Sequence, residues 1–140
     1  MNFSNDSSTD SQHKWWRSPG VIYFLAAGSP AVAIKMGVTT RATLLDRMKK
    51  TQAHNHEPIE LLGVIRFNDG EFPTRDAEDQ LRQLHARFAH LCRFKPHTRG
   101  AEWFNASPEL LDCIVEVTIS PEILGFPRFV CTPVDEDVSV

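Results

Sequence analysis

Apolar and polar positions are ordered along this chain in a way that predicts a small mixed domain. Three runs rich in β-branched, aromatic and other apolar residues, at 21–25, 31–38 and 59–67, lie between glycine, proline and asparagine turn signals and predict three strands. Only a few residues separate the first two runs, so we expect them to form an antiparallel hairpin.

Other segments show the helical period. Between residues 74 and 92 the apolar positions are spaced by four, three, four and three, which predicts the longest helix on Ala77, Leu81, Leu84, Phe88 and Leu91. Leu44, Leu45 and Met48 share one stripe of an earlier helix, and a last helix begins near Pro108, capped by Asn105 or Ser107. With a short apolar element at 103–104, the order is β-β-α-β-α-(β)-α. It predicts an α/β fold of the α+β kind, a small three-stranded antiparallel sheet flanked by helices.

The two ends of the chain differ from this body. Residues 1–18 are rich in Ser, Asn, Asp and Gln, which predicts a disordered polar tail. Trp15 and Trp16 would pack back onto the domain or, as the alternative, stack on a base. We therefore divide the chain into this tail, a domain at 19–117 and an acidic, proline-containing C-terminal extension at 118–140. Phe126, Phe129 and Val130 would lay part of the extension over the domain.

Length and composition narrow the class of protein. A chain of 140 residues, 41% hydrophobic and 24% charged, matches one globular domain. No apolar run approaches the roughly 18 residues of a membrane span, and the first residues lack the apolar core of a secretory signal. Three cysteines without a CxxC pair indicate reduced thiols, and so a cytoplasmic protein.

The formal net charge of −3 is unevenly spread. Residues 19–107 hold 12 basic and nine acidic residues, a net of +3, whereas residues 108–140 carry −6. A net +3 is ordinary for a solvated surface, and it is also compatible with a nucleic-acid partner. The acidic extension would then bind a protein partner or shield the basic face. On the second interpretation, deleting residues 132–140 would tighten DNA binding at low salt.

Five short motifs follow one another along the predicted domain. They read GVIYFL (20–25), IKMGVTT (34–40), LLDRMKK (44–50), AEDQLRQLHARF (77–88) and AEWF (101–104). In this order and spacing they resemble the GIY-YIG nuclease superfamily, more narrowly its phage- and bacterium-associated branch in which K-[IM]-G replaces Y-I-G. The resemblance covers residues 20–115. It implies an endonuclease that hydrolyses DNA phosphodiester bonds with Mg²⁺ or Mn²⁺.

The resemblance also implies roles for particular residues. Tyr23 would assist the water nucleophile, Arg47 would bind the scissile phosphate and Glu78 would hold the metal. His85 follows Glu78 by seven positions, on the same helix flank. Lys35 lies near the replaced second tyrosine, where it would contact the phosphate or lower the pKa of Tyr23. The residue types suit this chemistry, because guanidinium matches phosphate geometry and Mg²⁺ accepts one carboxylate with several waters.

Further residues are candidates for contacts to the substrate. Arg41 rivals Arg47 as the phosphate-binding arginine, and Lys49 and Lys50 would hold the DNA backbone. Trp103 is either a core anchor or a platform for a stacked base. These basic and aromatic groups would give DNA binding with modest sequence preference.

Other interpretations remain open from the sequence. Without the second tyrosine, the chain could be a catalytically inactive nucleic-acid-binding module, or a protein-interaction domain on the same fold. Glu78 could simply pair with Arg82 on a solvated helix face. A structural zinc site is a weaker option, since a spacing of five points two of its histidines to different helix faces. Its four ligands would be His85, His90, Cys92 and His97.

Overall fold

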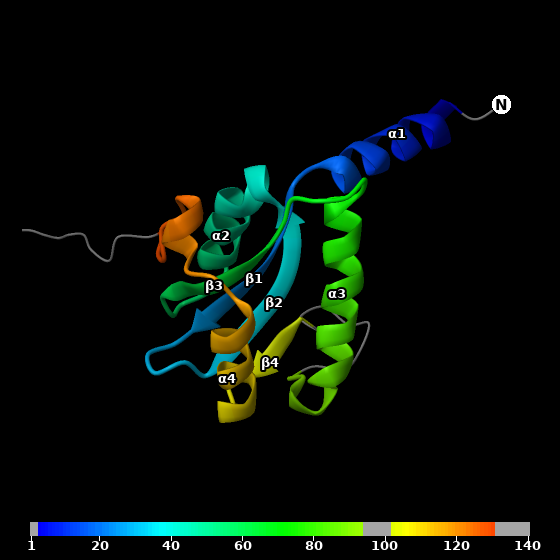
Figure 1. Cartoon of the computed structure of the whole chain (residues 1–140). Helices are drawn as coiled ribbons and strands as arrows, with labels where there is room; N and C mark the ends of the chain where they lie inside the picture. Colours follow the sequence, from blue (N-terminus) through cyan, green and yellow to red (C-terminus); the bar gives the residue numbers. More distant parts are fainter. Residues whose placement is uncertain (1–2, 94–101, 131–140) are drawn as a thin grey trace, which may run out of the picture.

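Four antiparallel strands form one sheet. The computed structural model describes residues 3–93 and 102–130, with side chains described from residue 9 onward. Strand β1 (Gly20–Ala27) lies between β2 (Ala33–Thr40) and β3 (Ile59–Phe67), and the short β4 (Trp103–Asn105) pairs with β2, in the order β3-β1-β2-β4 (Figure 1). The predicted antiparallel sheet flanked by helices is confirmed, and the short apolar element at 103–104 is its fourth strand.

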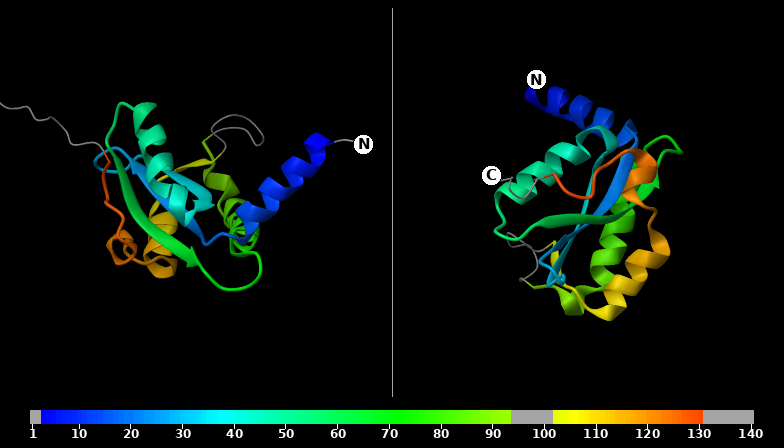
Figure 2. Two further views of the ribbon diagram at one scale, coloured as in Figure 1. Left: turned by 90° about the horizontal axis from the view of Figure 1, so that it is seen from above. Right: turned by 90° about the vertical axis from the view of Figure 1, so that its left-hand side faces the viewer.

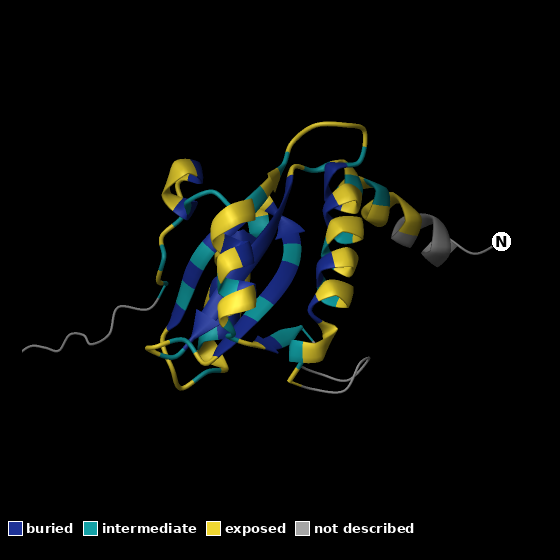
Figure 3. Ribbon diagram, turned by 60° about the horizontal axis from the view of Figure 1, so that its bottom comes forward, coloured by how far each residue is buried: buried dark blue, intermediate teal, exposed yellow. Residues whose placement is uncertain are grey.

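Helices cover both faces of the sheet. Helix α2 (Leu44–Ala53), which follows a 3₁₀ turn at Arg41–Thr43, lies on one face, and α3 (Pro73–Arg87) and α4 (Pro108–Val117) lie on the other (Figure 2). Alternation along β1 sends Ile22 and Phe24 toward α3 and α4, and Tyr23 and Leu25 toward α2. Because both faces are covered, β1 is buried along its whole length, as Figure 3 shows.

Two helix ends refine the predictions. Helix α3 ends at Arg87 rather than near residue 92, and a 3₁₀ turn at Ala89–Leu91 follows. Phe88, at φ −107° and ψ 22°, leaves the helical path while its ring stays fully buried. Ser107 is the cap of α4, because its side chain accepts the Leu110 N–H at 3.3 Å. Asn105 instead accepts a hydrogen bond from Arg93.

The prediction of a disordered N-terminal tail is wrong for the described residues. They form helix α1 (Phe3–Arg17), which packs chiefly on α3. The composition lacks an apolar stripe that would indicate a helix. Helix α1 is held in place by tertiary contacts of Trp15 and Trp16, whose indole N–H groups donate to Glu78 on α3. The expectation that this Trp pair packs back onto the domain is confirmed.

The chain after α4 returns along β3. Ile119 exchanges two backbone hydrogen bonds with Val64, and the Leu61 N–H donates to the Arg128 carbonyl at 2.8 Å. Between these contacts lies a 3₁₀ turn at Pro121–Leu124. The side chains of Phe126 and Val130 pack against the α2-side core, as expected, whereas Phe129 is 49% exposed. The acidic residues at 135–137 lie outside the described residues, so the predicted shielding and protein-partner roles of the extension stay predictions.

Two of the three cysteines lie within the described residues. Cys113 is buried, Cys92 is half-buried, and residue 131 lies outside the described part. None of the helices in residues 3–93 and 102–130 has the length and apolar character that crossing a bilayer requires.

Candidate active site

A cavity of about 590 Å³ opens on the α2 side of the sheet, next to the edge where β4 pairs with β2. Strand β2, helix α2 with the two residues that follow it, and the turn into β4 all contribute to its wall. The lining residues are Lys35, Arg47, Lys50, Thr51, His54, Asn55, Glu102 and Trp103. This wall is polar and carries both signs of charge, which suits an ionic ligand better than an apolar one.

Lys35 is the most enclosed charged group of the cavity. Its side chain is only 17% exposed, and its Nζ lies 3.4 Å from the Thr51 hydroxyl and 3.9 Å from a Glu102 carboxylate oxygen. Burial lowers the pKa of Lys35, and Glu102 opposes that shift by favouring the charged form. Lys35 therefore faces the candidate site, and its ammonium is a stronger acid than that of an ordinary lysine.

Tyr23 does not itself line the cavity; it is buried on the same face of the sheet as Lys35 and interacts electrostatically with Arg47 and Glu102, two of the lining residues. It stands opposite Gly37 in the β1–β2 register, and its ring lies across that glycine. A Cβ added at Gly37 would come within 2.5 Å of both Cζ and Oη of Tyr23. Burial raises the pKa of Tyr23; Arg47 lowers it and Glu102 raises it further. Lys35 is not among the groups that shift the pKa of Tyr23, and burial outweighs the opposing effect of Arg47, so the lowering expected from Lys35 is not found.

The structure separates the two candidate phosphate-binding arginines. Arg47 is exposed on α2 and lines the cavity. Arg41 instead donates to the Leu124 carbonyl at 3.4 Å, away from that cavity. Of the two lysines, Lys50 lines the cavity and pairs with Asp46 at 3.1 Å, whereas Lys49 is exposed on α2 outside the lining.

Glu78 and His85 lie elsewhere, although the sequence predicted one site. Both belong to α3, on the opposite face of the sheet from α2, and neither lines the cavity. The His85 Nε2 lies 3.0 Å from the Met36 carbonyl oxygen, and its ring packs against Phe104. Each Glu78 carboxylate oxygen accepts an indole N–H at 3.1 Å. The structure thus brings Tyr23, Lys35 and Arg47 together without Glu78 and His85.

Arg82 does not engage Glu78 either. It pairs with Asp79 on the exposed side of α3. The alternative interpretation of Glu78 as one half of an i, i+4 ion pair is therefore wrong, because two indoles occupy its carboxylate.

The donor set for a divalent metal can be tested on these contacts. The described residues contain no group of three or more His, Cys, Asp or Glu side chains that could hold an ion. The two indoles crowd Glu78, and a Mg²⁺ ion that keeps several waters needs open space beside its carboxylate. With α1 docked, the residues do not fit a metal at Glu78.

The possible zinc ligands also fail to assemble in the described part of the chain. His85 bonds to a backbone carbonyl, and the His90 Nε2 lies 3.0 Å from Glu109. Residue 97 lies outside the described residues. The weak zinc hypothesis gains nothing from these contacts.

Sequence reasoning missed part of the cavity wall. Glu102 appears in the AEWF motif, yet its position opposite Lys35 follows only from the pairing of β4 with β2. A signal for the helical part does exist, because Arg47 and Thr51 are spaced by four on one face of α2 and His54, its C-cap, follows three residues later. Trp103 lines the cavity and also packs against the core, so it serves as an anchor with an accessible edge.

Comparison with known proteins identifies the family to which this domain belongs. A family model, the T5orf172 domain, matches residues 20–118, which covers the whole sheet and helices α2 to α4. This phage-associated domain is related to nuclease-like proteins, and it is consistent with a nuclease or DNA-binding role. Searches of curated proteins and of solved structures give no significant match. Because the family model spans most of the chain, with the candidate cavity inside it, the chain belongs to the T5orf172 domain family.

Proposed function

We propose that this protein is a DNA endonuclease that hydrolyses phosphodiester bonds in the cavity between α2 and β4. The observation that carries the proposal is the convergence of Tyr23, Lys35 and Arg47 beside one polar cavity. These three residues come from three different elements, within a domain related to nuclease-like proteins.

Arg47 would bind the scissile phosphate. Its guanidinium projects from α2 into the cavity wall, and its planar donors match the oxygens of a phosphate. Charge builds on the non-bridging oxygens as water attacks phosphorus, so a positioned cation stabilises the transition state more than the ground state. Lys50 and Trp103 would hold the neighbouring backbone and base.

Hydrolysis also requires proton transfer. The water oxygen bonds to phosphorus and releases a proton to solvent, the bond from phosphorus to the leaving sugar oxygen breaks, and that oxygen takes up a proton from a donor in the cavity. Lys35 suits the role of proton donor because burial lowers its pKa. Tyr23 has a raised pKa, so it stays a neutral phenol near neutral pH and would orient the water rather than act as a base.

The divalent metal that the sequence resemblance implies, Mg²⁺ or Mn²⁺, is kept as a separate proposal, because the contacts of Glu78 in this arrangement do not fit an ion. The steps above do not use it, because Glu78 lies outside the cavity and bonds to Trp15 and Trp16 in this arrangement. Metal dependence is therefore a separate part of the test.

The experiment measures nicking of supercoiled plasmid with and without Mg²⁺ or Mn²⁺. We expect Arg47→Gln to lower the rate about 100-fold or more, as loss of one charge-stabilising group does, and Tyr23→Phe to lower it as well. Arg41→Gln is the matched control, since Arg41 bonds to a backbone carbonyl outside the cavity. Glu78→Ala tests whether nicking depends on a metal bound through Glu78. DNA binding without nicking by the wild type, or equal losses in both arginine variants, would refute the proposal.

A second function is favoured by specific contacts. Tyr23 is only 2% exposed, and two indoles occupy Glu78, as expected for a nucleic-acid-binding module without catalysis. Such a module would bind DNA in a salt-dependent way and lose affinity in Arg47→Gln. It would show no nicking under any metal condition.

A further inference from the structure

His54 lies at the end of helix α2, and one of its ring nitrogens is held by the backbone. It is the C-cap of α2 and lines the candidate cavity. Its Nδ1 lies 2.8 Å from the carbonyl oxygen of Lys50, one helical turn earlier. A carbonyl oxygen only accepts hydrogen bonds, so Nδ1 must carry the hydrogen and donate it. In a neutral imidazole with Nδ1–H, the other nitrogen, Nε2, keeps a free lone pair.

That lone pair is available to a ligand. No hydrogen bond joins Nε2 to another group in the described part of the chain, and His54 is exposed. The Nδ1 bond therefore orients the ring from one side, while Nε2 stays accessible to water in the cavity. A proton-accepting nitrogen on a ring held in one orientation is the arrangement that a general base requires.

The other side chains of the cavity wall leave the role of proton acceptor open. Lys35 would donate a proton to the leaving oxygen, and Glu102 lies 3.9 Å from its Nζ, so that carboxylate is engaged with a cation. Arg47 and Lys50 are cations without an acceptor lone pair, and the Asn55 amide is neither an acid nor a base at neutral pH. Histidine, by contrast, is the side-chain class that exchanges protons near neutral pH.

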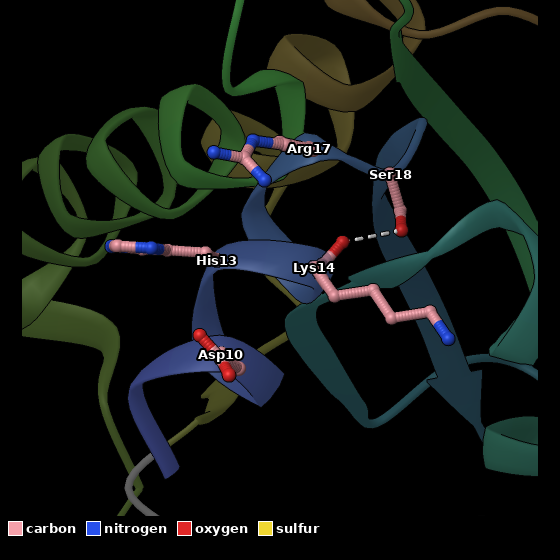
Figure 4. Close-up of a pocket in the computed structure, with 5 residues that line it drawn as sticks. All are labelled: Asp10, His13, Lys14, Arg17 and Ser18. Carbon is pink, nitrogen blue, oxygen red and sulfur yellow. Dashed lines mark hydrogen bonds between the residues drawn. The ribbon is translucent and has the colours of Figure 1, made fainter. Parts of the chain in front are cut away.

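A second cavity-lining histidine stands in a different setting. His13 lines a hollow of about 570 Å³ along α1, together with Asp10, Lys14, Arg17 and Ser18 (Figure 4). Its ring packs near those of Trp16 and Phe72, with ring centroids 5.8 Å and 6.3 Å away. The residues proposed for hydrolysis lie elsewhere. Of the two histidines, His54 is the one that shares a cavity with Arg47.

We propose that His54 is the general base of the hydrolysis, a role that rests on the proposed function. Its Nε2 accepts a proton from the attacking water as the water oxygen bonds to phosphorus. The bond from phosphorus to the leaving sugar oxygen breaks, and that oxygen takes up a proton from Lys35. The imidazolium then passes its proton to solvent, since His54 is exposed, and Lys35 regains a proton from water. Both groups end in the state in which they began.

The first experiment compares the nicking of supercoiled plasmid by full-length variants. His54→Ala removes the base, and His54→Gln keeps an amide that can donate a hydrogen bond but cannot take up a proton. His56→Ala is the matched control, because His56 is also exposed but lies outside the cavity lining. We expect an about 100-fold lower rate in both His54 variants, as loss of a general base implies, and an unchanged rate in His56→Ala.

Two further readouts separate a base from a structural role. Imidazole added to the buffer should restore nicking in His54→Ala in proportion to its concentration, and it should leave Arg47→Gln unaffected. DNA affinity, measured by fluorescence anisotropy, should be equal in His54→Ala and the wild type. A His54→Ala protein that nicks as fast as the wild type, a loss that imidazole does not restore, or a loss explained by weaker DNA binding overturns the proposal.

The tautomer of His54 can be tested without any reaction. In isotopically labelled wild type, long-range proton–nitrogen NMR spectra distinguish Nδ1–H from Nε2–H in a neutral imidazole, and the spectrum of His54→Ala assigns the signals. We expect the Nδ1–H form. The Nε2–H form overturns the proposal, because Nε2 would then lack the free lone pair.

The outcomes also distinguish the base from the nuclease. Nicking that falls in both Arg47→Gln and His54→Ala, with rescue by imidazole only in the latter, supports both proposals. Nicking that falls in Arg47→Gln but not in His54→Ala supports the nuclease and overturns the base. An absence of nicking by the wild type under every metal condition overturns both.

Discussion

A methyl group at residue 37 should destabilise the protein through a single contact. Gly37 lies on β2 directly opposite Tyr23 on β1. The phenol ring crosses the glycine so closely that an alanine Cβ would stand 2.5 Å from Cζ and Oη, and 3.0 Å from Cε1. No ordinary van der Waals contact is that short, so the Gly37→Ala variant must move the ring.

The size of the effect follows from the burial of the ring. Tyr23 is 2% exposed, so the ring moves against packed neighbours. Overpacking of this kind costs about 1–3 kcal/mol of unfolding free energy. Replacing glycine by alanine within a strand would otherwise stabilise by about 0.5–1 kcal/mol. We therefore expect Gly37→Ala to lower the unfolding free energy by about 1–2 kcal/mol.

A double-mutant cycle isolates the contact. Tyr23→Leu removes Cζ, Oη and Cε1, the three atoms nearest the added methyl. In that background Gly37→Ala should instead stabilise by about 0.5–1 kcal/mol, giving a coupling energy of about 1.5–3 kcal/mol between the two sites. Urea unfolding with linear extrapolation measures all four proteins. An equal cost of Gly37→Ala in both backgrounds would show that the Tyr23 ring is not the reason that position 37 requires glycine.

Three further predictions concern single side chains. Tyr23 is the only tyrosine, so ultraviolet absorbance titration reads its phenol alone. The pKa of Tyr23 should lie above 10.0 in the wild type. Compared with the wild type, this pKa should be lower in Glu102→Gln and higher in Arg47→Gln. The raised pKa of folded Tyr23 adds stability that is complete below the unfolded pKa of about 10 and is lost as pH rises toward the folded value. Thermal melts of Tyr23→Phe should therefore show a smaller alkaline loss than wild type. Thr74→Val removes a buried hydroxyl that donates to the Ser18 carbonyl at 2.7 Å. It should cost about 1–3 kcal/mol in urea unfolding, with Thr74→Ser recovering most of it.

Local patterns predicted the sheet well. The run at 59–67 matches β3, and the apolar run at 21–25 lies inside β1. Alternation places Tyr23 and Lys35 on one face once the two strands pair, because Tyr23 faces Gly37 and Leu25 faces Lys35. Two of the candidate residues could thus be joined from sequence and hairpin geometry alone.

The position of Glu78 could not be predicted in the same way. The helical period indicates which side of α3 is buried, but not which face of the sheet that side covers. The assignment of Glu78 to the predicted site therefore rested only on the order of the motifs. Its actual partners are the indoles of Trp15 and Trp16, some 60 positions earlier in the chain. No pattern in a segment of serine, asparagine and aspartate indicates that contact.

The segment that returns along β3 has a consequence for assembly. β3 is an outer strand of the sheet, and an open strand edge is a template on which another chain can pair and aggregate. Backbone bonds from Ile119 and Arg128 occupy part of that edge, and the Arg128 guanidinium lies 3.3 Å and 3.4 Å from the carbonyls of Leu61 and Leu62. The residues that follow the last helix thus cover part of the β3 edge, so a strand of another chain cannot pair with that part. The other outer strand, β4, is only three residues long.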